Sequence, residues 1–164
     1  MTAANRSSFV YVIFIRTKPE KLWEALTDPE FARKYWFGTT VESSWKTGSP
    51  WKLVASNGSP TDIGEILEFD PPRRMVIRWQ NEWKPELKAE GPSRCTMELE
   101  PVGSAVKLTI THEIERPDSK LITAVSGGWP RVLSNLKSLL ETGEIAITEA
   151  QHHDLRAREL RKLS

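Results

Sequence analysis

Apolar and polar residues alternate with a period of two in several segments of the chain. Segments with this pattern, or with runs of β-branched and aromatic residues, cover residues 8–16, 39–43, 50–55, 61–69, 75–83, 93–100 and 105–114. Such segments are typical of β-strands. Turn residues such as Asn57-Gly58-Ser59-Pro60 separate them, and the short connections favour hairpin partners. We therefore predict a mainly antiparallel meander.

Helical patterns flank this sheet. Residues 17–20 have capping-box spacing, and Asp28-Pro29 begins a second short helix that ends at Gly38. A longer helix is predicted up to Gly143, with its first turn at Gly128–Pro130, because one face collects Trp129, Val132, Leu133, Leu136, Leu139 and Leu140. Residues 118–125 are expected to form one or two separate helical turns, with a break at residues 126–128.

The alternation also indicates which strand positions face the long helix. One face carries the apolar positions 106, 108, 110 and 114 together with His112, and similar rows contain Cys95, Met97 and Leu99 on the strand before. A sheet with one apolar face must be covered, which predicts an α+β fold with the C-terminal helix as cover. The pair Ile66-Leu67 interrupts the alternation, so the direction of Glu65 stays open and a bulge would decide it.

Composition limits the function classes. The 164 residues suggest one domain, which we place at residues 1–143, followed by a polar, basic tail at residues 144–164. Twenty-three basic and 22 acidic residues give a net charge of +1, which argues against nucleic acid as partner. The single cysteine excludes an intrachain disulfide. No targeting segment or apolar run of about 20 residues is found, so we expect a cytoplasmic protein without a membrane span.

Several longer segments resemble the Activator of Hsp90 ATPase homologue-like family of the SRPBCC superfamily, which includes START-related lipid carriers and cyclases. The matching segments are KPEKLWEALTDPE (18–30), KYW (34–36), GEILEFDPPRR (64–74), MELEPVG (97–103), LTITHE (108–113) and GWP (128–130). The resemblance implies a helix-grip fold, in which a curved sheet of six to seven strands holds the long helix around a cavity. It implies no single function, because this fold hosts carriers, cyclases and co-chaperone domains. The eukaryotic activator also has an N-terminal domain that contacts the chaperone, for which we expect no counterpart in 164 residues.

Seven tryptophans, against two tyrosines and five phenylalanines, are numerous for this length. Each is either core filling or part of a cavity wall. Combined with the expected inner face, they predict a ligand cavity lined by Trp23, Trp36, Trp51, Leu53, Ile77, Trp79, Met97, Leu108, His112, Trp129, Leu133 and Leu136. Trp23 and Trp36 are expected near its mouth, and Trp45 and Trp83 lie near turns.

His112 is the polar member of an apolar strand face, so its imidazole is either satisfied structurally or meets a ligand. The leading interpretation is non-catalytic binding of a small apolar or amphipathic molecule. Two competing interpretations are a co-chaperone-like interaction module, as a homodimer or with a chaperone, and a cavity enzyme of cyclase or hydrolase type. In an enzyme, His112 and Glu65 would be the acid–base pair; otherwise no catalytic residue is predicted, because the common catalytic motifs are absent.

No metal or cofactor is predicted. His152-His153-Asp154 are adjacent in sequence, and adjacent residues do not face one way on a helix. We expect them to belong to a solvated tail. Cys95 falls on the apolar face and is expected to be inert packing.

Overall fold

Seven antiparallel strands form one sheet in the computed structural model, which describes residues 5–162. The strands are β1 (Ser7–Ile15), β2 (Thr40–Ser43), β3 (Pro50–Val54), β4 (Pro60–Asp70), β5 (Arg74–Asn81), β6 (Ser93–Val102) and β7 (Ala105–Ile114). Their order across the sheet is β1-β7-β6-β5-β4-β3-β2. The predicted meander is therefore confirmed from β2 to β7, and β1 forms an edge by pairing with β7.

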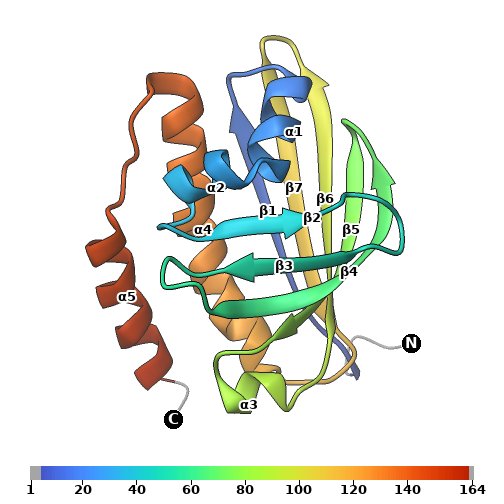
Figure 1. Cartoon of the computed structure of the whole chain (residues 1–164), viewed down its shortest axis with the longest axis vertical. Coiled ribbons are helices and arrows are strands. Elements are labelled where there is room, and N and C mark those ends of the chain that lie inside the picture. The colour runs from blue at the N-terminus through green and yellow to red at the C-terminus, as the bar shows by residue number, and fades with distance from the viewer. Residues whose placement is uncertain (1–4, 163–164) are drawn as a thin grey trace.

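Helices cover one face and the ends of this sheet (Figure 1). They are α1 (Pro19–Thr27), α2 (Pro29–Tyr35), α3 (Pro85–Lys88), α4 (Lys120–Thr142) and α5 (Glu149–Arg161). The helices α1 and α2 lie at one end of the molecule and α3 lies at the other, while α5 runs beside α4. The α+β prediction is confirmed, with α4 as the long helix that the sheet wraps.

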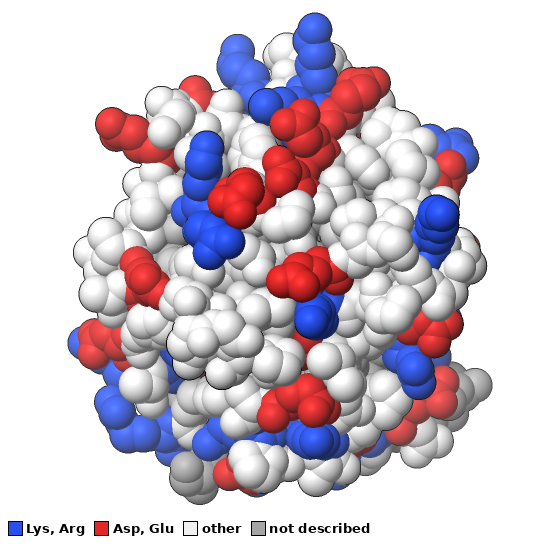
Figure 2. Space-filling view, viewed as in Figure 1, with Lys and Arg blue, Asp and Glu red and all other residues white. Residues whose placement is uncertain are grey.

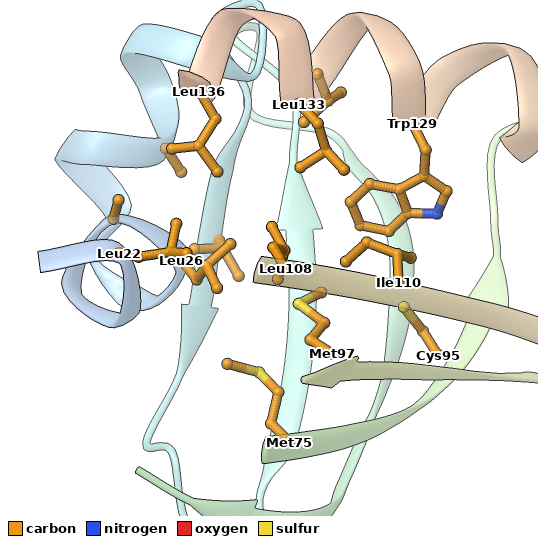
Figure 3. Packing of buried hydrophobic residues seen from close by; sticks show 14 of the residues in the cluster. Leu22, Leu26, Met75, Cys95, Met97, Leu108, Ile110, Trp129, Leu133 and Leu136 are labelled. Carbon is orange, nitrogen blue, oxygen red and sulfur yellow. The ribbon is translucent and has the colours of Figure 1, made fainter. Parts of the chain in front are cut away.

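The core lies between α4 and the inner face of the sheet. Leu133 and Leu136 are completely buried and point from α4 toward the strands (Figure 3). The side chains that meet them there include Leu108, Ile110 and Met97. The C-terminal half of α4 therefore packs against the sheet without leaving a large space.

The predicted break at residues 126–128 is wrong, because α4 is continuous from Lys120. Ser119 caps its first turn, and Glu90 accepts hydrogen bonds from the backbone N–H groups of Lys120 and Leu121. A Cβ on Gly127 would clash with the carboxylate of Glu159 on α5, so this glycine leaves room for the side chain that pairs with Arg131. Gly127 thus sits inside a helix for a reason of packing space that the local pattern does not show.

The chain after Gly143 forms an ordered helix, α5, in place of a solvated tail. Thr148 and Gln151 form a capping box at its start. The side chain of the buried Asn135 on α4 holds the connecting loop, because its Oδ1 accepts from the N–H groups of Ala146 and Ile147 and its Nδ2 donates to the Ile147 carbonyl. Residues 163 and 164 of the predicted tail lie outside the described part of the chain.

A β-bulge settles the direction of Glu65. The register between β4 and β5 shifts between Ile66 and Glu68, and Glu65 stands opposite Arg78. The neighbours of Arg78 along β5, Ile77 and Trp79, are buried, so Glu65 and Arg78 lie on the outer face, where their side chains are 3.5 Å apart. Glu65 therefore points away from the core.

The face seen in Figure 2 carries no single dominant charge. Lysine and arginine side chains alternate with aspartate and glutamate over the face seen in Figure 2. On the outer face of β1, the apolar side chains Val10, Val12 and Phe14 are about half exposed. Among residues 5–162, no helix combines the length and the hydropathy that crossing a membrane requires.

Candidate ligand-binding cavity

A cavity of about 380 Å³ lies between the sheet, the N-terminal half of α4 and the inner side of α5. The sheet contributes Leu53, Asp62, Trp79 and Asn81; α4 contributes residues from Leu121 to Val132; α5 contributes His152, Arg156, Glu159 and Leu160; Trp36, Trp83, Leu87 and Lys162 complete the wall. This size lies within the usual range for sites that hold small organic molecules.

Trp79 is the centre of the aromatic wall. Its ring centroid lies 4.5 Å from that of Trp51, 5.8 Å from that of Trp129 and 6.5 Å from that of Trp36. Gly64 stands between Trp51 and Trp79 in the register of β3, β4 and β5. A Cβ on Gly64 would lie 1.6 Å from the Arg78 carbonyl oxygen, so no side chain separates the two indoles.

His112 holds this wall in place from behind. The indole Nε1 of Trp129 donates to His112 Nδ1 at 3.2 Å, and His112 Nε2 lies 2.8 Å from Ser93 Oγ. Because an indole only donates, Nδ1 is the acceptor, and the proton of the neutral ring sits on Nε2. Ser93 Oγ in turn donates to the Trp79 carbonyl at 3.1 Å. The completely buried imidazole is thus fully satisfied by protein groups and orients Trp129.

The lining of the cavity contains a buried carboxyl group. Asp62 is 8% exposed, and its Oδ2 accepts from Trp79 Nε1 at 2.7 Å and from Asn81 Nδ2 at 3.5 Å. Burial raises the pKa of this carboxyl to about 6, against the opposing effect of its hydrogen bonds. Asp62 therefore changes charge close to neutral pH.

Arg131 on α4 binds residues of α5 on the side of the cavity that α5 forms. Its guanidinium forms a bidentate pair with Glu159, and its Nε donates to His152 Nδ1 at 3.1 Å. The His152 ring stacks on Phe37, with 3.9 Å between the centroids. His152 is therefore buried, which corrects the expectation that it belongs to a solvated tail. The physical reason is that a planar imidazole can stack on an aromatic ring while it accepts a hydrogen bond from arginine.

Acid should destabilise the protein through its two buried histidines. Burial lowers the pKa of His112 and of His152 to about 3 from the ordinary value of 6.5, and nearby arginines add to the effect at His152. Below pH 6.5 the two histidines become protonated in the unfolded chain but stay neutral in the folded protein. Each histidine therefore lowers the free energy of unfolding by up to about 1.4 kcal/mol per pH unit. Asp62 opposes them between pH 3.8 and about 6, because there the folded protein holds a proton that the unfolded chain releases. Because two histidines act against one carboxyl group, the free energy of unfolding decreases on balance as the pH is lowered.

Denaturant unfolding from about pH 7 to about pH 5 measures this loss. In His152→Gln, whose amide oxygen can still accept from Arg131, the dependence on pH should become clearly shallower. An unchanged dependence in that variant would contradict the assignment.

Four of the predicted cavity residues line the cavity: Trp36, Leu53, Trp79 and Trp129. The others belong to the packed core: Trp23, Trp51, Ile77, Met97, Leu108, His112, Leu133 and Leu136. Trp23 lies against Phe69, with 5.3 Å between the rings, and Trp45 packs on the same phenylalanine. The tryptophans therefore form one group around Trp79 and a second around Phe69, with Trp83 in the cavity wall.

The acid–base pair considered for an enzyme is not brought together. His112 lies inside the core with both nitrogens occupied, and Glu65 lies on the outer face beside Arg78. Burial raises the pKa of the Cys95 thiol, in line with a packing role. Within residues 5–162, no cluster of three or more acidic, histidine or cysteine side chains is arranged to hold a metal ion.

Sequence reasoning missed the polar groups of the site. Asp62 and Asn81 alternate in step with Gly64 and Trp79, so the period of two could have placed both on the inner face. The sequence gives no comparable signal for Arg131 and the residues of α5. A helix whose inner side is polar has the same sequence pattern as a helix that is surrounded by solvent.

The sheet folded around α4 with a cavity beside it defines a helix-grip fold. The chain belongs to the family described as Activator of Hsp90 ATPase homolog 1-like protein, which matches residues 16–141. That match ends before α5, which supplies one wall of the cavity. No curated protein matches the sequence significantly.

Solved structures share the fold at low sequence identity. CalU16 from Micromonospora echinospora is 19% identical, with a TM-score of 0.67 over 94% of this chain and 84% of its own. The Aha1 dimer from Colwellia psychrerythraea is 20% identical, with a TM-score of 0.68 over 84% of this chain and 98% of its own. PFC0360w, an HSP90 activator from Plasmodium falciparum, is 24% identical, with a TM-score of 0.67 over 81% of this chain and 95% of its own.

Proposed function

We propose that the chain binds a small apolar or amphipathic molecule in the cavity between the sheet, α4 and α5. The observation that carries this proposal is the cavity of about 380 Å³, whose lining combines Trp36, Trp79 and Trp129 with a few charged groups. Binding sites for small molecules combine an apolar wall with a few polar groups in this way. The binding is non-catalytic, with His112 as a positioning residue for Trp129.

A co-chaperone-like role and a cavity enzyme are supported by membership of the family alone. One structural neighbour is named as a dimer and another as an HSP90 activator, and those names describe those proteins. For this chain, the homodimer, the chaperone contact and the cytoplasmic location stay predictions. The pair needed for the cavity enzyme, His112 and Glu65, lies on opposite faces of the sheet.

Gly128 offers a test that leaves the core intact. This glycine lines the cavity, and a Cβ placed on it would meet no atom within 4 Å. Gly128→Leu should therefore fill part of the cavity while raising helix propensity by up to about 1 kcal/mol. In a titration followed by tryptophan fluorescence, we expect 1-decanol to bind the wild type and to bind Gly128→Leu at least about tenfold more weakly, which corresponds to about 1.4 kcal/mol.

Gly128→Ala is the matched control, because it also replaces glycine by a better helix former but adds only a methyl group to the cavity. It should keep most of the affinity for 1-decanol. Equal affinity in the wild type and in Gly128→Leu, with both variants folded, would show that the alcohol binds elsewhere.

A further inference from the structure

The charged groups that line the cavity are not balanced. The cavity contains the three basic side chains Arg131, Arg156 and Lys162 and the two carboxyl groups of Asp62 and Glu159. Arg131 and Glu159 pair with each other and cancel. Two cations then face only Asp62, so the electrostatic potential of the cavity is positive, and low-dielectric walls strengthen its effect on a bound charge.

Arg156 is the cation within this excess that projects from α5 without an acidic partner. Within residues 5–162 it forms no ion pair with a carboxylate, in contrast to Arg158, which lies 2.8 Å from Asp154. Its Nη2 lies 3.0 Å from His153 Nδ1, and its guanidinium sits 5.1 Å from the centre of the Trp83 ring. The half-buried guanidinium is thus held in position by an imidazole and an indole and keeps donors for a further acceptor.

Asp62 does not provide an equivalent site for a cation. Its Oδ2 already accepts hydrogen bonds from Trp79 and Asn81. Burial raises the pKa of the Asp62 carboxyl, whereas burial and the neighbouring Arg131 lower the pKa of Arg156 against a smaller opposing effect of the Asp62 charge. Both pKa shifts have burial as their largest cause, which means that the charged form of each group is poorly solvated in the cavity. Asp62 relieves this by taking a proton as the pH falls toward about 6, but an arginine does not give up its proton, so a ligand anion is the group that would relieve Arg156.

We propose that the molecule bound in this cavity is an amphipathic anion, whose head group pairs with the guanidinium of Arg156 and whose apolar part lies against Trp79 and Trp129. This inference rests on the proposed function and adds the chemical class of the ligand. A carboxylate suits the guanidinium because the two groups can form parallel hydrogen bonds.

Three probes with the same ten-carbon chain separate the effect of the head group from that of the apolar part. Decanoate, 1-decanol and decylammonium are titrated into the wild-type protein and followed by tryptophan fluorescence. We expect decanoate to bind about tenfold or more tightly than 1-decanol, since hydrogen bonds between charged groups are the stronger ones. Decylammonium should bind most weakly.

Arg156→Gln should remove the advantage of decanoate, so that decanoate and 1-decanol bind this variant within about twofold of each other. Arg158→Gln changes the same residue type on the same helix outside the cavity and should preserve the order of the three probes. Should Arg156→Gln fail to fold, the order of the probes on the wild type still decides the question, because that comparison needs no variant.

The outcomes distinguish the two proposals. Equal affinity of the wild type for decanoate and 1-decanol overturns the anionic head group and leaves the cavity as a binding site. Tightest binding of decylammonium also overturns it, and assigns the head group to Asp62. If none of the three probes binds, the proposed function itself fails.

Discussion

Replacing Trp79 by alanine should lower the free energy of unfolding by about 3–5 kcal/mol, one of the two largest effects expected of a single substitution here. Trp79 is 4% exposed and contacts the rings of Trp36, Trp51 and Trp129. Truncation removes these contacts and leaves a void in the wall. It also removes the indole donor from Asp62, a buried carboxyl whose loss of a partner adds to the cost.

Trp79→Phe separates the two contributions. Phenylalanine keeps most of the aromatic contact and lacks the donor, so we expect a loss of about 1–3 kcal/mol. Chemical denaturation of both variants measures the difference. If the alanine variant lost less than the phenylalanine variant, Trp79 would not be the centre of the wall.

Replacing Arg131 by methionine should lower the free energy of unfolding by about 2–3 kcal/mol. The loss of one partner from a buried ion pair leaves the other charge uncompensated, and the partial exposure of Glu159 reduces the cost below that of a fully buried pair. His152 also loses the donor at its Nδ1. Because these contacts join α4 to α5, the loss should appear together with a release of α5, seen as faster amide hydrogen exchange in residues 149–161.

The double variant Arg131→Met/Glu159→Met completes this test. With both charges removed, it should recover a large part of the stability, because no unpaired charge remains near the core. Arg158→Met is the matched control, since Arg158 forms an exposed pair with Asp154 at 2.8 Å on α5 and should cost less than about 1 kcal/mol. Equal losses in Arg131→Met and Arg158→Met would contradict the role given to the Arg131 pair.

The period of two was enough to predict the sheet. It located all seven strands and placed positions such as Ile77 and Leu108 on the inner face, because a sheet with one buried face records that burial in alternate residues. The apolar face of α4 could also be predicted, because its buried residues recur at helical spacing in the sequence. The continuity of this helix through residues 126–128 was not predicted, because Gly127 and Gly128 are weak helix formers and their role depends on what lies next to them in space.

The candidate site was less predictable than the fold. Alternation identifies the inner face but does not say where that face is filled and where it is hollow. At Leu133 and Leu136 the core side chains fill the space, whereas near Leu121 and Gly128 they leave a cavity. The helix α5 was missed because His152 and Arg131 hold it through a polar contact, which leaves no apolar stripe in the sequence.

Nuclear magnetic resonance of the seven indole N–H groups tests the central claim most directly, because some of the tryptophans line the cavity and others do not. On titration with 1-decanol or decanoate, the resonances of Trp36, Trp79, Trp83 and Trp129 should shift, since these side chains line the cavity. Those of Trp23 and Trp45, which pack against Phe69, should stay in place. An absence of shifts with both probes, or shifts confined to Trp23 and Trp45, would contradict a binding site between the sheet, α4 and α5.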